Sequence, residues 1–153
     1  MSVDTVKPLT NPMTMKIIAS SAVPARAETE KVLQIANDAE LAEVAAAGTL
    51  QGVERVELSF PKFTDGRAFS QAVLLRRRYG FTGDIRATGD VLIDQLVQMA
   101  RSGFTSAVLA EGIDPAAAER QFARYQAFYQ GDALEPRPLF ARELARETTQ
   151  EAA

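Results

Sequence analysis

Short apolar segments with the pattern of β-strands alternate four times with longer segments that have the period of α-helices. The strand-like segments are 31–36, 53–60, 85–87 and 104–110, and the helix-like segments are 38–47, 66–79, 89–102 and 114–130. Val, Ile, Leu and Phe dominate the first set, and apolar residues recur every three or four positions in the second. Such a repeat predicts a parallel sheet with helical, right-handed crossovers. We therefore expect an α/β fold with a small four-stranded, mainly parallel sheet flanked by helices.

Two architectures fit four β-α units: a small doubly wound domain, or half of an eight-fold barrel. The single α/β domain is expected over residues 31–131. Residues 1–30 contain three prolines and no sustained period, which indicates a flexible N-terminal arm, and residues 132–153 read mainly as a C-terminal tail. The open edges of the sheet can be covered by these tails or by another subunit, as in a homo-oligomer.

Composition excludes several classes of function. The net charge of −3 and the acidic pI of about 5.1 disfavour binding to nucleic acid or to an anionic membrane. No apolar run approaches the roughly 20 residues of a membrane span, and residues 15–23 resemble only a short, weak signal peptide. We expect a cytoplasmic protein. Cysteine and histidine are absent, which excludes disulfides, thiolate nucleophiles, His/Cys metal sites and histidine general bases. No cofactor and no metal site is implied by the sequence.

Polar and charged residues gather where the predicted strands end and the next helices begin. Because the carboxyl ends of parallel strands share one edge, these residues should meet there. Arginines, helix N-termini and glycines that let a ligand approach the backbone suit a small oxyanion such as phosphate, sulfate, sulfite or a carboxylate. The anion-binding candidates are Lys62, Asp65, Gly66, Arg67, Arg86, Gly89 and Asp90, with Thr88 and Glu111 nearby and Asp94 and Gln95 as secondary candidates.

Structural roles for the same residues remain open. Asp65, Thr88 and Asp90 suit helix caps. Arg67 opposes the helix dipole in the first turn of its helix, so Asp65, Asp90 or a bound anion should offset it. Arg86 would be costly inside a covered sheet unless it reaches the edge or meets a carboxylate. No arrangement of a nucleophile and its base is visible, so catalytic residues are unknown and enzymatic activity is undecided.

Several segments together resemble a bacterial family of unknown function. They are Phe60-Pro61-Lys62-Phe63-Thr64-Asp65-Gly66-Arg67-Ala68-Phe69-Ser70, Leu74-Leu75-Arg76, Gly80-Phe81-Thr82-Gly83, Arg86-Ala87-Thr88-Gly89-Asp90-Val91-Leu92, Asp94-Gln95 and Gly103-Phe104. On these motifs, residues 31–130 are identified as similar to bacterial family of unknown function 934, described as an oxidoreductase involved in sulfite reduction. The resemblance implies a role beside assimilatory sulfite reductase and the proteins of sulfate activation, and it implies no catalytic role for any residue.

Two expectations of function follow. The first is an accessory protein of assimilatory sulfite reduction, within sulfur assimilation and cysteine biosynthesis, that binds a sulfur oxyanion or the sulfite reductase itself. The second is a small α/β enzyme that acts on a phosphorylated or sulfated metabolite held by Arg67 and Arg86. A redox enzyme with its own nucleotide cofactor ranks third, because no Gly-x-Gly-x-x-Gly turn opens a helix. A flavin-dependent oxidoreductase stays open as an alternative, and such a protein would be yellow when purified.

Overall fold

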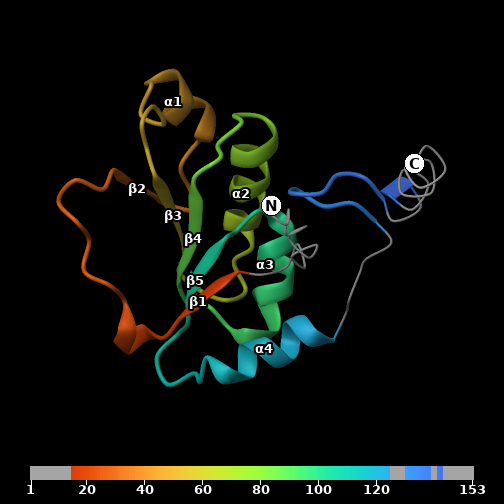
Figure 1. The fold of residues 1–153 in the computed structure, drawn as a ribbon. Coiled ribbons are helices and arrows are strands. Elements are labelled where there is room, and N and C mark those ends of the chain that lie inside the picture. Colours follow the sequence, from red (N-terminus) through yellow and green to blue (C-terminus); the bar gives the residue numbers. More distant parts are fainter. Residues whose placement is uncertain (1–14, 125–129, 139–140, 143–153) are drawn as a thin grey trace, which may run out of the picture.

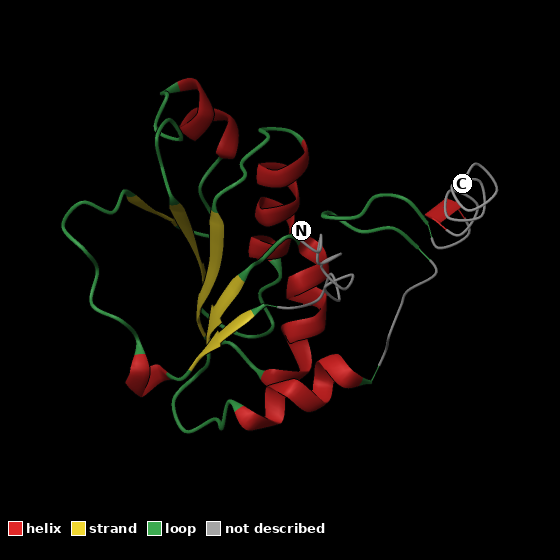
Figure 2. Cartoon of the chain, in the orientation of Figure 1, coloured by secondary structure: helices red, strands yellow, loops and turns green. Residues whose placement is uncertain are grey.

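The computed structural model describes residues 15–124, 130–138 and 141–142. Their core is a five-stranded parallel sheet in the order β1-β5-β4-β3-β2 (Figures 1 and 2). The strands are β1 (Lys16–Ile18), β2 (Val32–Ile35), β3 (Arg55–Phe60), β4 (Asp84–Gly89) and β5 (Ser106–Val108). The α/β class and the parallel sheet are confirmed, but the predicted number of four strands is wrong. The additional strand, β1, lies inside the segment predicted to be an N-terminal arm.

The helices line up along one face of the sheet. They are α1 (Leu41–Ala46), α2 (Arg67–Arg77), α3 (Leu96–Ser102), which follows the 3-10 helix η2 (Ile93–Gln95), and α4 (Ala116–Ala123). From β2 to β5 the strands follow one another in sequence order, so right-handed crossovers place α1, α2 and α3 on the same side. Consecutive helices touch one another along this side. Helices thus flank the parallel sheet, as predicted.

The connection from β1 to β2 covers part of the opposite face. It runs from β1 at one edge of the sheet to β2 at the other edge, in the direction opposite to the helical crossovers from β2 to β5. A right-handed connection in that direction must cross the other face of the sheet. It contains the 3-10 helix η1 (Ser20–Ala22) and otherwise has no regular structure. We call residues 19–31 the strap. Figure 1 shows it as an orange loop on the side of the sheet away from α2 and α3.

The main hydrophobic core lies between the sheet and the helices. Val56, Leu58 and Phe60 of β3 alternate with polar residues, and all three are fully buried against this side. Phe60 packs on Phe69 of α2 and on Phe104, with ring centroids 5.1 and 5.7 Å apart. Burial of apolar area at roughly 25 cal/mol per Å² is the main force that fixes the helices to the sheet.

Two predicted helix starts are wrong, and both errors concern the carboxyl edge of the sheet. The predicted helix over 89–102 begins only at Ile93 as η2 and continues as α3, because β4 runs to Gly89. Gly89 has φ +90°, and a Cβ there would lie 2.4 Å from the carbonyl oxygen of Phe60 on β3. The predicted helix over 38–47 begins at Leu41, and Asn37 does not cap it.

Candidate functional site

The face of the sheet that carries no helix is lined by polar side chains. On the central strands, Arg55, Glu57 and Ser59 of β3 alternate with buried apolar residues, and Asp84, Arg86 and Thr88 do the same on β4. Strand register aligns Gln34, Glu57, Arg86, Ser106 and Lys16 in one row across all five strands. A parallel sheet usually has apolar residues on both faces because helices cover both. Of the segments that the structure describes, only the strap crosses this face, so polar side chains can occupy it.

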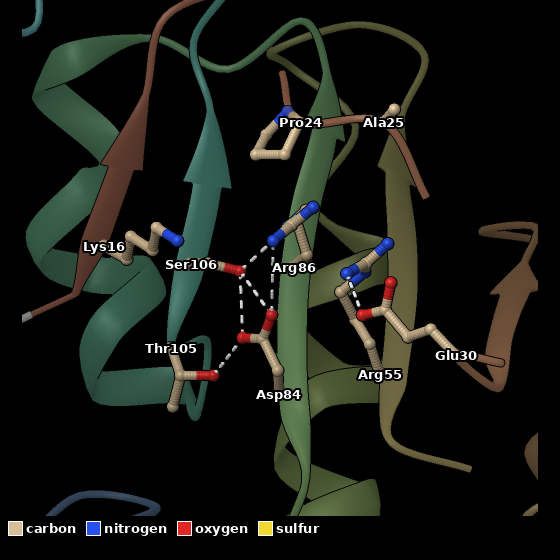
Figure 3. A pocket seen from close by; sticks show the side chains of 9 residues that line it. All are labelled: Lys16, Pro24, Ala25, Glu30, Arg55, Asp84, Arg86, Thr105 and Ser106. Atoms are coloured by element: carbon tan, nitrogen blue, oxygen red, sulfur yellow. Dashed lines mark hydrogen bonds and ion pairs between the residues drawn. The ribbon is translucent and has the colours of Figure 1, made fainter. Parts of the chain in front are cut away.

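A pocket of about 380 Å³ lies on this open face, beneath the strap (Figure 3). Its walls come from β1, the strap, β3, β4 and the start of β5. The lining residues are Lys16, Pro24, Ala25, Glu30, Arg55, Asp84, Arg86, Thr105 and Ser106. Three cations thus face two carboxylates, an excess of positive charge in a protein of net charge −3.

Arg86 lies at the centre of the pocket. Its side chain is only 8% exposed, yet few of its donors are used. Nε donates to Ser106 Oγ at 3.1 Å, and Nη2 lies 3.6 Å from Asp84 Oδ2, an ion pair longer than a hydrogen bond. Within the described part of the chain, Nη1 and Nη2 have no hydrogen-bond acceptor within 3.5 Å. Figure 3 shows part of the guanidinium pointing away from Asp84, toward the strap. Unused donors of a buried guanidinium are what an anionic ligand would engage.

Asp84 is held in position by two hydroxyl groups from the neighbouring strand region. Thr105 Oγ1 donates to Asp84 Oδ1 at 2.5 Å, and Ser106 Oγ lies 2.9 Å from both carboxylate oxygens. Thr105 Oγ1 also accepts the N–H of Ile85 at 3.0 Å. These bonds fix the carboxylate beside Arg86, while the carboxylate side chain remains 32% exposed to the pocket.

Lys16 and Arg55 stand on opposite sides of Arg86. Lys16 is exposed and makes no ion pair with any residue that the structure describes, and Figure 3 shows its Nζ pointing toward Ser106. Arg55, in contrast, is paired with Glu30 at the end of the strap and with Glu57 at 3.2 Å. The pocket therefore offers Lys16 and Arg86 as available cations, and Arg55 serves mainly to hold the strap to the sheet.

The residues predicted from the sequence divide between this pocket and the carboxyl edge. Arg67 starts α2 and pairs with Asp65, with Nη2 and Oδ2 2.8 Å apart, and Asn37 Nδ2 donates to the same Asp65 oxygen at 2.7 Å. The hydrogen bonds from Arg67 lower the pKa of Asp65 to about 2. Asp65 thus neutralises the charge of Arg67, which is one of the predicted alternatives.

The charge of Arg86 is neutralised separately by Asp84, and Arg86 lines a pocket that does not include Arg67. The expected side-by-side placement of the two guanidinium groups is wrong, because Arg86 sits in mid-strand and not at the edge.

Asp90 and Gln95 hold the loop that follows β3. Asp90 Oδ2 accepts the N–H of Phe63 at 2.9 Å, and Gln95 Nε2 donates to the carbonyl of the same residue at 2.8 Å. The backbone N–H and carbonyl of Phe63 are thus both hydrogen-bonded, although the residue is 49% exposed. These two predicted site residues position a loop in this structure.

The other candidates contribute less to a common site. Gly89 does not begin a helix, and the backbone that approaches it closely is the carbonyl of Phe60. Gly66 has an ordinary negative φ at the start of α2, and Lys62 and Asp94 are exposed. Thr88 and Glu111 stand apart from the pocket lining. No group of three or more acidic residues among the described positions is arranged to hold a metal ion.

The sequence reasoning missed Lys16, Asp84, Thr105 and Ser106. The available signal was the strict alternation of polar and apolar residues in 55–60 and 84–88, two segments that pair with each other. Such alternation in central parallel strands indicates that one face has no helical cover.

None of the described helices is both long enough and apolar enough to cross a membrane. Neither a search of curated proteins nor a search of solved structures returns a significant match. A family model does match, over residues 32–140, and its description is a bacterial protein of unknown function, DUF934. The match covers more than two thirds of the chain and includes β2 to β5. Five of the nine residues that line the pocket fall within it, namely Arg55, Asp84, Arg86, Thr105 and Ser106, whereas Lys16 and the strap precede it. The chain therefore belongs to the DUF934 family of bacterial proteins of unknown function.

Proposed function

We propose that this protein binds a small oxyanion in the pocket of the open sheet face, as an accessory protein of assimilatory sulfite reduction. The observation that carries the proposal is the almost buried Arg86 guanidinium. Among the described residues, its Nη1 and Nη2 have no hydrogen-bond acceptor, and the neighbouring Lys16 forms no ion pair. Anions of the size of sulfite or sulfate fit a pocket of about 380 Å³. The link to sulfite reduction comes from the family resemblance of the motifs.

The anion-binding part is tested by thermal shift with sulfate, sulfite, phosphate, adenosine phosphosulfate and flavin. Binding to the folded state raises its stability by mass action, by about 2.7 kcal/mol at a hundredfold excess over Kd. Gln keeps a hydrogen-bond donor for Ser106 but lacks the positive charge of arginine. Arg86→Gln should therefore abolish the shift. Arg67→Ala is the matched control and should keep the full shift. If the shift were lost in Arg67→Ala but kept in Arg86→Gln, the anion site would lie at the carboxyl edge and the proposed pocket would be wrong.

The partner part of the proposal concerns the loop after β3. Phe63 is about half exposed, and its backbone is fixed by Asp90 and Gln95. An exposed aromatic side chain on a rigid loop loses little entropy on binding and is typical of the centre of a protein interface. We propose that this loop contacts the sulfite reductase. A pull-down with the purified reductase should recover the wild-type protein and lose most of it with Phe63→Ala, whereas Leu134→Ala, which removes another exposed apolar side chain, should have no effect.

A second candidate function is an enzyme that acts on a phosphorylated or sulfated metabolite. The observation in its favour is the Ser106 hydroxyl, which lies between the Asp84 carboxylate at 2.9 Å and the Arg86 Nε at 3.1 Å. A hydroxyl that donates to a carboxylate beside a bound anion has the components of an acid–base site. Release of phosphate or sulfate from a panel of such esters, lost in Ser106→Ala, would favour this candidate. Equal rates of ester hydrolysis for the wild-type protein and Ser106→Ala, both at the uncatalysed level, would exclude this candidate function.

A further inference from the structure

We propose that the pocket selects an oxyanion that still carries a proton, and that Asp84 is the residue that determines this specificity. The inference rests on the proposed function, because it concerns the ligand of the same pocket. It distinguishes hydrogensulfite and hydrogenphosphate from sulfate, which carries no proton near neutral pH.

The Asp84 carboxylate is oriented but not saturated. Oδ1 accepts from Thr105 Oγ1, and Ser106 Oγ lies 2.9 Å from both oxygens with a single proton to share between them. Among the described residues no other hydrogen-bond donor reaches Oδ2, and Arg86 Nη2 is 3.6 Å away. An ionised carboxylate has no donors and about four acceptor positions. Oδ2 therefore keeps acceptor capacity on the side that faces the pocket.

Arg86 Nη2, a hydrogen-bond donor, and Asp84 Oδ2, an acceptor, lie next to each other, 3.6 Å apart. A ligand hydroxyl placed beside them can accept a hydrogen bond from Arg86 Nη2 and donate one to Asp84 Oδ2. A bare oxyanion oxygen can satisfy Arg86 but turns its lone pairs toward the carboxylate. That arrangement brings like charges together and leaves the pocket-facing acceptor position of Oδ2 unfilled, which costs binding free energy in a partly desolvated site. Lys16 can hold the remaining oxygens of either anion without distinguishing them.

Asp84 cannot easily turn away to relieve this conflict. Two hydroxyl groups of consecutive residues, Thr105 and Ser106, hold it from one side, and Thr105 is itself fixed by the N–H of Ile85. A preorganised acceptor of this kind rejects ligands that lack the matching donor more strongly than an apolar wall rejects a slightly wrong shape.

The test compares anions of equal charge and tetrahedral shape by isothermal titration, at a pH above the second ionisation of phosphoric acid. Hydrogenphosphate carries one proton, whereas sulfate and monofluorophosphate carry none. We expect hydrogenphosphate to bind the wild-type protein at least roughly tenfold more tightly than either, the discrimination expected for one unpaired polar group. Asp84→Asn keeps an acceptor for Thr105 and Ser106 and adds a donor, so it should remove the preference or reverse it. Its fold is checked by circular dichroism.

The outcomes separate the two proposals. Sulfate and monofluorophosphate binding as tightly as hydrogenphosphate would overturn the role of Asp84 and leave the anion site standing. The affinities of the three anions for the wild-type protein decide this point even if Asp84→Asn does not fold. Absence of binding for all three anions and for sulfite would overturn the proposed function and, with it, the inference.

Discussion

Arg86 and Asp84 stand two residues apart on β4, so their side chains leave the same face of the sheet and form an ion pair with 3.6 Å between Nη2 and Oδ2. This pair makes an arginine tolerable in a central strand, because a guanidinium that is only 8% exposed would be costly without a carboxylate beside it. Because both residues also line the candidate pocket, a change in this pair should affect the stability of the fold as well as the site.

Replacement of Asp84 by Ala should destabilise the fold. The change removes the acceptor of Thr105 and Ser106 and leaves Arg86 without its counter-charge. We expect a loss of about 2–3 kcal/mol in the free energy of unfolding, less than the roughly 3–5 kcal/mol of a fully buried pair because Asp84 is partly exposed. Urea denaturation measures the difference. Asp94→Ala, at an exposed aspartate of η2, is the control and should stay within about 0.5 kcal/mol of wild type. Equal losses for both variants would contradict the importance of the pair.

Arg76 should be required for the turns at the amino edge of the sheet. It lies on α2 and donates to the carbonyls of Gly103, Phe81 and Gly83 at 2.9, 3.0 and 2.7 Å. Burial lowers its pKa. Arg76→Ala leaves these carbonyls without a charged donor and should cost about 2 kcal/mol or more. Arg77→Ala, at an exposed neighbour on the same helix, should change the melting temperature little. A wild-type melting temperature for Arg76→Ala would show that water replaces the three bonds.

Gly89→Ala should be much more damaging than Gly112→Ala. Both glycines have positive φ, +90° and +81°, so each substitution adds the strain of a left-handed residue, about 1–2 kcal/mol. Only at Gly89 would the new Cβ lie 2.4 Å from a backbone oxygen, that of Phe60, whereas at Gly112 it meets nothing within 4 Å. We expect a loss of about 3 kcal/mol or more at Gly89 from strain and overpacking together. Similar unfolding free energies for the two variants would contradict the close approach of β3 and β4.

The pKa of Asp65 should depend on Arg67. Hydrogen bonds from Arg67, with a smaller one from Asn37, hold the pKa near 2, below its ordinary value of 3.8. The pair therefore stabilises the fold above about pH 3.8, and this contribution is lost as the pH falls toward 2. Arg67→Ala should raise the pKa toward 3.8 in a carbon NMR titration of the carboxyl group. Arg137→Ala, which removes the similar partner of Glu135, should leave Asp65 unchanged. A pKa that stays near 2 without Arg67 would assign the effect to another group.

The sequence predicts most of the sheet, because β2 to β5 carry the apolar pattern of strands next to helices of clear period. β1 was missed because Lys16, Ile17 and Ile18 are too few to show a pattern, and their pairing with β5 is decided by a contact far along the chain. The helix start at Gly89 was misjudged for a related reason. Leu92 and Ile93 fit a helical period, but the left-handed Gly89 and the hydrogen bond from the Asp90 N–H to the Phe60 carbonyl keep that segment with the strand.

The candidate site was only partly predictable. The sequence indicates that Arg86 must either reach the edge of the sheet or meet a carboxylate, and the carboxylate is Asp84, two residues earlier on the same strand. Local sequence cannot place Lys16 or the strap. Lys16 comes beside Ser106 through the pairing of β1 with β5, and the strap reaches the pocket as the connection from β1 to β2. Asp65 and Arg67 were correctly linked to each other, because their bond spans only two residues.

The most direct test of the central claim is a titration of the nitrogen-15 labelled protein with sulfite, followed through the side-chain Nε–H signals of its arginines. Arg86→Gln and Arg67→Ala assign the two relevant signals, and both are observed in the same spectrum. The account predicts a saturable shift of the Arg86 signal with the Arg67 signal unmoved. A saturable shift of Arg67 with Arg86 unmoved, or no shift of either at saturating sulfite, would contradict it.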